Sequence, residues 1–370
     1  MRRNGNINKE MQGVHAIVRV LFASFFFLYF FKSQEAAISL AQHLLSGGQT
    51  TYHPFIGSCV LTTILMGIQY AVCKYSNIPD RFYVLTFMPS VACAILPLSI
   101  LPSLHTGILI LSAACGLLWI ILEVVFYISS EKSRETGSPA MIPNLLFSLV
   151  MAVFLGAAGC SNDVMNYEVQ AARYISAGKY KETLEVGKKS LATSHILTAL
   201  RAYAMSCLPE GMGHYLFEFP LPSGGSRMLY LSAADSSKTL FPIDSLSFLR
   251  TTGLQELHPD SSFTSNQRRA ADYRLCGYLL DKQLDRFAAE LKRYYVISDS
   301  TVLPKYYEQA LVLHERLNIH ENHADYVNPS VRANYLDFKE KEHKYSDPVE
   351  RSNRLRREYG DTYWWYYFYH

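Results

Sequence analysis

The stretch GILILSAACGLLWIILEVVFYI, residues 107–128, holds 22 residues and a single charged side chain, Glu123. A helix rises about 1.5 Å per residue, so this stretch is long enough to cross the roughly 30 Å hydrocarbon core of a membrane. Apolar runs of similar length also occupy residues 14–31, 55–73, 82–101 and 143–160. The sequence therefore predicts about five transmembrane helices, with the third kinked at Pro89 and Pro97.

Charge density divides the chain into two parts. Lys, Arg, Asp and Glu occupy 15 of the first 160 positions and 52 of the remaining 210. The first density, about 9%, is far below that of soluble domains, whereas the second, about 25%, is ordinary. We expect a transmembrane domain over 1–160 and a soluble domain over 161–370. The second part holds 26 basic and 26 acidic residues, and this balance argues against nucleic acid as a partner.

Loop charges predict the orientation. With a cytoplasmic N-terminus, the short outside loops carry Lys32 alone, and cytoplasmic loops are the ones enriched in Lys and Arg. An odd number of spans then places 161–370 outside. We expect a bacterial inner (cytoplasmic) membrane protein with a periplasmic C-terminal domain and the lipid bilayer as a partner. The inside segments would carry Arg2, Arg3, Lys9, Lys74, Arg81, Lys132 and Arg134.

The first run could instead be a signal peptide. Basic residues precede it, but it lacks a small-x-small cleavage site and is followed by Lys32. These features favour an uncleaved helix.

The soluble part has the pattern of helical hairpins. Residues 166–191 space their apolar side chains as two helices with a turn at Gly178-Lys179, and similar turns follow near Gly211 and Lys282. This spacing resembles the tetratricopeptide repeat, a helix-turn-helix unit of about 34 residues. The predicted fold is all-α: a bundle of about five transmembrane helices, then a tetratricopeptide-like α-solenoid or a plain helical bundle. A solenoid has a concave surface that binds peptides or proteins.

The chain ends with seven consecutive aromatic residues and His370. These rings could cap the last helical hairpin, lie at the membrane–water interface or form an exposed recognition tail. The candidate interaction or interface residues are Trp364, Trp365, Tyr366 and Tyr367.

The first outside loop carries a short helical pattern at 36–45 that breaks at Gly47-Gly48. We expect this helix either in the plane of the interface or packed on the bundle. Glu35, His43 and His53 are the polar residues of this loop that an outer-leaflet catalytic or transport site would use.

No catalytic motif is present. The sequence lacks a Walker A loop, a dinucleotide-binding glycine fingerprint, a GxSxG elbow and an HExxH pair. No catalytic residue, cofactor or metal is predicted, and a non-enzymatic role is favoured.

Several polar residues have simpler explanations than chemistry. Cys207 and Cys276 could pair in an oxidising periplasm, although the apolar helical pattern around each favours two buried thiols. Asp272, Asp281 and Asp285 follow the pattern of an exposed helical face. His314, His320 and His323 are read as surface histidines rather than metal ligands.

Four segments together resemble a known group of sequences: YHPFIG after the first span, LRAYAMSCLPEGMGHYLFEFP, ADYRLCGYLLDKQLDRFA and the terminal YGDTYWWYYFY. They are similar to an uncharacterised family of membrane proteins from Bacteroides-type bacteria. The resemblance implies an inner-membrane location and a helical outer domain, and it implies no substrate.

The function predicted from these features is that of a scaffold or assembly factor in the envelope, whose periplasmic helical domain binds a protein or peptide partner. The alternative is a membrane enzyme or transporter that acts on a lipid-linked or glycan substrate.

Overall fold

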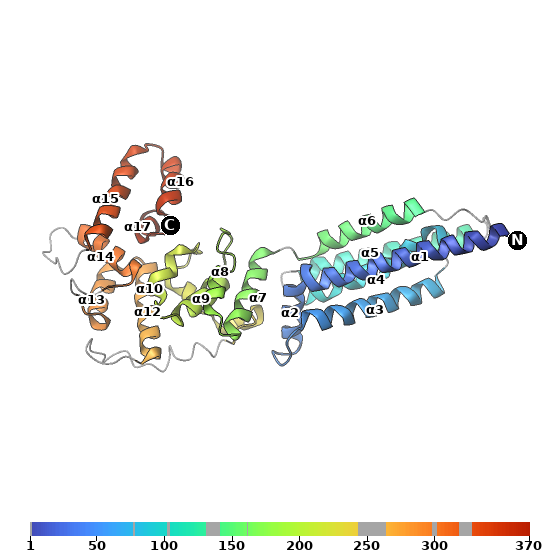
Figure 1. The fold of residues 1–370 in the computed structure, drawn as a ribbon, viewed down its shortest axis with the longest axis horizontal. Coiled ribbons are helices and arrows are strands. Elements are labelled where there is room, and N and C mark those ends of the chain that lie inside the picture. Colours follow the sequence, from blue (N-terminus) through green and yellow to red (C-terminus); the bar gives the residue numbers. More distant parts are fainter. Residues whose placement is uncertain are drawn as a thin grey trace. The chain divides into compact units, whose positions relative to one another are not determined.

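The computed structural model describes residues 2–76, 78–101, 104–130, 141–160, 162–242, 264–297, 302–317 and 328–370. These residues form helices joined by turns and loops, with no β-strand among them. They divide into two compact units, Met1–Met165 and Asn166–His370 (Figure 1). The all-α fold predicted from the sequence is confirmed.

Among its described residues, the first unit holds five segments that are long and apolar enough to cross a membrane. The helices α1, α3, α4, α5 and α6 run alongside one another in Figure 1. Outward side chains such as Leu117, Ile120 and Val124 are at least half exposed, which suits lipid rather than water. The five segments are Gln12–Ser33, Pro54–Tyr75, Phe82–Ile100, His105–Ile128 and Met141–Ala158. The elements are α1 (Arg2–Leu28), the π-helical turn η1 (Tyr29–Ser33), α2 (Glu35–Leu45), α3 (Pro54–Tyr75), η2 (Asp80–Phe87), α4 (Met88–Ile95), η3 (Leu96–Ile100), α5 (His105–Ser130) and α6 (Met141–Ala158).

The third apolar segment is a broken helix. It consists of η2, α4 and η3, and Pro89 and Pro97 stand in the first turns of α4 and η3. Proline lacks an N–H and clashes with the preceding turn, so it is tolerated in a helix mainly at its start. Both predicted kinks therefore occur as helix breaks.

The short helix α2 packs on the bundle. All six residues from Ala36 to Ala41 are buried within the first unit, and the N–H of Ile38 donates to the carbonyl of Gln34 at the start of the helix. Of the two predicted placements for this helix, in the interface plane or packed on the bundle, the structure therefore shows packing on the bundle.

Polar side chains join the helices inside the first unit. The hydroxyl of Tyr83 accepts hydrogen bonds from Arg19 Nε at 2.6 Å and from Gln69 Nε2 at 2.8 Å. Asn144 Oδ1 accepts from the backbone N–H of Val84 at 3.0 Å. Hydrogen bonds of this kind add specificity to helix packing in lipid, where apolar surfaces alone give little.

The second unit is a helical domain whose first helix starts just before the unit boundary. Its elements are α7 (Asp163–Ser176), α8 (Tyr180–Glu185), α9 (His195–Ser206), α10 (Met212–Tyr215), η4 (Leu216–Glu218), η5 (Gly225–Leu229), η6 (Ala233–Lys238), α12 (Ser265–Leu280), α13 (Leu284–Tyr294), α14 (Lys305–Leu317), α15 (Pro329–Lys344), α16 (Pro348–Tyr359) and α17 (Tyr363–Tyr369).

The predicted turns lie where the sequence places them, but the helices that follow are unequal. Gly178, Gly211 and Lys282 all adopt positive φ between successive helices. However, α8 has 6 residues and α10 has 4, whereas α13 has 11. The turns are confirmed, whereas the unequal helices give no regular repeat, so the tetratricopeptide-like fold stays a prediction.

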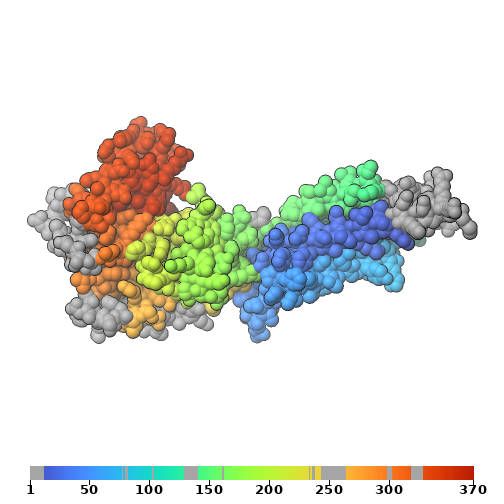
Figure 2. All heavy atoms as spheres, viewed as in Figure 1, coloured from blue at the N-terminus to red at the C-terminus, as the bar shows by residue number. Residues whose placement is uncertain are grey.

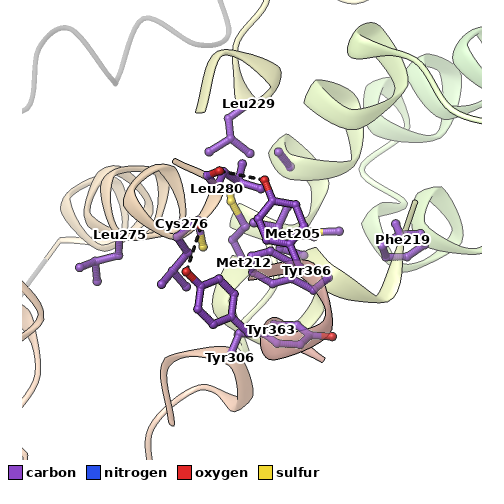
Figure 3. Packing of buried hydrophobic residues seen from close by; sticks show 14 of the residues in the cluster. Met205, Met212, Phe219, Leu229, Leu275, Cys276, Leu280, Tyr306, Tyr363 and Tyr366 are labelled. Carbon is purple, nitrogen blue, oxygen red and sulfur yellow. Dashed lines mark hydrogen bonds between the residues drawn. The ribbon is translucent and has the colours of Figure 1, made fainter. Parts of the chain in front are cut away.

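The core of the second unit is unusually aromatic. Phe217 lies about 5 Å from three other rings, with centroid distances of 5.0 Å to Tyr306, 5.2 Å to Tyr363 and 4.9 Å to Tyr366. Figure 3 shows Tyr363 and Tyr366 inserted among core residues of other helices. Tyr363 and Tyr366 therefore join α17 to η4, more than 140 positions earlier in the chain.

Candidate functional site

A cleft of about 1010 Å³ opens in the second unit. We call it the Asp272 cleft. Its walls come from the loop after α9, from α12 and from the end of α13. The residues on which the argument below depends are Glu210, Arg268, Arg269, Asp272 and Tyr295.

Asp272 is a buried carboxylate at this cleft, with 4% of its surface exposed. Its Oδ1 accepts hydrogen bonds from the hydroxyls of Tyr307 at 2.9 Å and Tyr295 at 3.2 Å. The backbone N–H of Met212 also donates to the carboxylate. Burial nevertheless raises the pKa of Asp272, because the three hydrogen bonds only partly offset the loss of hydration.

Gly211 allows the approach of Asp272. It adopts φ 74° and ψ 177°, a combination that is essentially confined to glycine. A Cβ at this position would lie 2.4 Å from Asp272 Oδ2. The glycine therefore supplies both the turn and the space through which the carboxylate reaches the start of α10.

The arrangement favours binding over covalent chemistry. The oxygens of Asp272 are engaged by hydrogen-bond donors. The nearby Cys276 is fully buried, and burial raises the pKa of its thiol well above the ordinary value, so it stays neutral and is a poor nucleophile. Across the described ranges, no three His, Cys, Asp or Glu side chains are grouped to hold a metal ion.

The polar groups that a ligand would meet include two arginines, tyrosines and the carboxylate of Glu210. Arg268 is exposed at the cleft. Arg269 Nε donates to Ser206 Oγ at 3.1 Å, and its guanidinium lies 5.0 Å from the ring centre of Tyr203. These contacts hold one guanidinium in place, and pre-positioned groups lower the entropic cost of binding.

A second hollow of about 590 Å³ lies between the loop after α8 and the C-terminal helices. We call it the tail groove. Residues of 188–193 and 217–221 line one part of it, and Arg356, Arg357, Trp365 and His370 line the other. In Figure 2 the C-terminal helices, in red, lie beside the green to yellow segments.

The aromatic tail is mostly core. Trp364 is fully buried and Tyr366 is 6% exposed, and the hydroxyl of Tyr366 donates to the carbonyl of Leu280 at 2.8 Å. Trp365 and Tyr367 are half-buried. Of the four predicted interaction residues, Trp365 and Tyr366 line the tail groove, whereas Trp364 has no surface to offer a partner.

The three residues predicted for an outer-leaflet site lie at different positions along the first loop. Glu35 stands in the first turn of α2 and His43 in its last, about 12 Å apart along the helix axis. His53 is exposed and precedes α3. Glu35 and His43 therefore occupy opposite ends of one helix, and the helix does not place them side by side.

The cysteine and histidine predictions have different outcomes. Cys207 and Cys276 are both free thiols, half-buried and buried respectively. His314 Nε2 lies 3.0 Å from Asp285 Oδ1. His320 and His323 lie outside the described residues.

Among the described residues, Arg201 and Asp272 are the two most buried charged side chains, and neither was expected from the sequence. Asp272 was predicted on an exposed helical face, and that prediction is wrong. Asp272 precedes Leu275 by three residues and Cys276 by four, so it lies on the apolar face of α12. This spacing is a sequence signal from which its burial could have been predicted. Arg201, 1% exposed in α9, has no comparable signal because arginine is rarely buried.

The comparisons with known proteins give one match. Residues 258–370 match the model of a family of unknown function (DUF6057), and this range includes α12 to α17. No curated protein and no solved structure matches the chain.

Proposed function

We propose that this protein is a membrane-anchored binding protein of the bacterial envelope. Its five apolar helices anchor it in the inner membrane with the N-terminus in the cytoplasm, and its helical domain captures a protein or peptide partner in the periplasm. In this role it acts as a scaffold or assembly factor rather than as an enzyme.

The observation that carries the proposal is the Asp272 cleft. Its volume of about 1010 Å³ is at the upper end of the roughly 300–1,000 Å³ typical of ligand sites. The buried hydrogen bonds of Asp272 to Tyr295 and Tyr307 make its floor rigid, and Arg268 provides an exposed cation at its mouth. A rigid cleft with mixed polar and aromatic walls suits a short stretch of polypeptide.

Site-specific photo-crosslinking in living cells tests this proposal. A photoreactive amino acid is placed at Arg268 or Glu210, both at the cleft, and in a matched control at Glu340, which is 72% exposed on α15. We expect one and the same envelope protein, identified by mass spectrometry, to crosslink from 268 and 210 and not from 340. Equal crosslinking from all three positions, or none from the cleft, would contradict the proposal.

A further inference from the structure

The tail groove holds more basic than acidic side chains. Two of its charges already have partners: Lys188 Nζ lies 2.9 Å from Glu185 Oε1, and Asp361 Oδ2 lies 3.0 Å from Lys305 Nζ. The basic residues that line the groove are Lys188, Lys189, Arg356 and Arg357, and the acidic ones are Glu218 and Asp361.

Three of the cations remain without a carboxylate. Within the described part of the chain, no Asp or Glu oxygen lies within 4.0 Å of Lys189, Arg356 or Arg357. These cations stand on two elements, the turn after α8 and the helix α16. An anionic ligand in the groove would therefore meet positive charge from both.

A buried cation adds to this positive charge. Arg201 is 1% exposed, and its guanidinium lies 4.6 Å from the ring centre of Phe219, which lines the groove. Its Nη2 donates to the carbonyl of Val186 at 2.8 Å, while Nε and Nη1 have no hydrogen-bond partner in the described structure. Burial lowers the pKa of Arg201 to about 10, so the side chain stays protonated at neutral pH. An unpaired charge in a poorly polarisable interior acts over a longer distance than one in water.

Much of the remaining lining of the groove is apolar. Phe217 and Phe219 are buried residues of its lining, Trp365 is half-buried, and Leu191 is 70% exposed at its edge. The groove thus combines an apolar surface with cations on more than one side.

We infer that the tail groove binds an acidic segment of a partner polypeptide, with apolar side chains against Phe219 and Trp365 and carboxylates beside Lys189, Arg356 and Arg357. An extended chain fits because its successive side chains point in opposite directions and so reach both floor and walls. This surface is separate from the Asp272 cleft, and the inference does not depend on that cleft.

Other anionic macromolecules suit the groove less well. A membrane surface is broad, so it would contact the exposed cations without entering the groove of about 590 Å³. A nucleic-acid duplex is likewise too broad to enter the groove. After position 160 the chain has 26 basic and 26 acidic residues, and this balance gives no extended basic face.

Peptide binding to the full-length protein in detergent tests the inference. The probe is a short fluorescent peptide of alternating glutamate and leucine, and its lysine–leucine counterpart serves as the ligand control. Fluorescence anisotropy at low and high salt measures the dissociation constants. We expect the acidic peptide alone to bind, and its binding to weaken with salt because exposed ion pairs are screened.

The decisive comparison is between two double variants. Lys189→Glu with Arg357→Glu reverses two charges of the groove, and Lys181→Glu with Lys344→Glu reverses two exposed charges elsewhere on the domain. We expect the groove variant to weaken binding by about tenfold or more, equivalent to about 1.4 kcal/mol, and the control variant by less than about twofold. The single change Lys189→Gln, in an exposed turn, repeats the test if the double variant unfolds.

Any one of three results would overturn the inference. The first is that the unaltered protein does not bind the acidic peptide, and the second is that both variants weaken binding equally. The third is that the groove variant loses binding to phosphatidylglycerol vesicles while its binding of the peptide is unchanged. The last result would assign the groove to anionic lipid. None of the three bears on crosslinking at Arg268, so the two proposals fail separately.

Discussion

Two glycines with nearly the same φ have different surroundings. Gly178 adopts φ 70°, and no atom lies within 4 Å of the position that a Cβ would take there. At Gly211, with φ 74°, a Cβ would lie 2.4 Å from Asp272 Oδ2. Gly178 therefore lacks the clash that a side chain would meet at Gly211, where the φ/ψ combination is in addition essentially confined to glycine.

We expect Gly178→Ala to lower the free energy of unfolding by about 1–2 kcal/mol, the cost of left-handed backbone for alanine. Gly211→Ala should cost about 1–3 kcal/mol more, because Asp272 must move and because alanine is strained at ψ 177°. Thermal unfolding of the full-length protein, followed by near-UV circular dichroism, measures both. Equal losses would show that Asp272 gives way easily and does not form a rigid floor.

The burial of Asp272 predicts a pH dependence. Burial raises its pKa above the ordinary 3.8. At pH values between 3.8 and the raised pKa, the folded state therefore binds more protons than the unfolded state. The contribution of Asp272 to the free energy of unfolding is therefore fully present below 3.8 and is lost as pH rises through the raised pKa.

This dependence is measured by comparing the unaltered protein with Asp272→Asn at several pH values. The unaltered protein should gain stability relative to the variant as pH falls toward 3.8. A difference between protein and variant that is independent of pH would contradict the burial argument.

At the level of single elements, α17 has the character of a core helix despite its place beside the tail groove. Thr362 caps it by accepting from the N–H of Trp365, and Trp364 packs 5.6 Å from the ring of Tyr335 in α15. Lys282, in the turn after α12, donates to the carbonyl of His370 at 2.9 Å. The helix is thus held at both ends.

Neighbouring tryptophans of α17 should respond differently to truncation. Trp364→Ala removes a fully buried ring and should cost about 3–5 kcal/mol, whereas Trp365→Ala, at a half-buried position, should cost clearly less. Chemical denaturation of the full-length protein in detergent measures both. A larger loss at Trp365 would reverse the assignment of the buried face of α17.

At the scale of the whole molecule, the distribution of basic residues predicts the orientation of the chain in the membrane. Alkaline phosphatase fused after His370 should be active in intact bacterial cells, because the enzyme folds only in an oxidising compartment. Fused after Ser76, close to Lys74 and Arg81, it should be inactive. The opposite pattern would refute the positive-inside assignment and with it the periplasmic placement of both binding surfaces.

Some properties of this protein follow from the sequence alone because they depend on local composition. Apolar runs such as 107–128 and 143–160 predict membrane-length helices without knowledge of their neighbours. The turns at Gly178 and Gly211 are likewise readable, since glycine is the residue that tolerates positive φ at least cost. The resemblance to an uncharacterised family agrees in its broad form with the match of 258–370 to a family of unknown function.

Other properties depend on which segments meet in space, and only the tertiary structure decides them. The spacing of Asp272 to Leu275 and Cys276 indicates the apolar face of its helix, but its partners Tyr307, Tyr295 and Gly211 stand on other segments of the chain. The tail groove combines residues more than 130 positions apart in sequence, such as Lys189 and Arg357. Burial and electrostatic environment are sums over such distant neighbours, so a pattern read along the chain predicts the helices but not the surfaces that their packing creates.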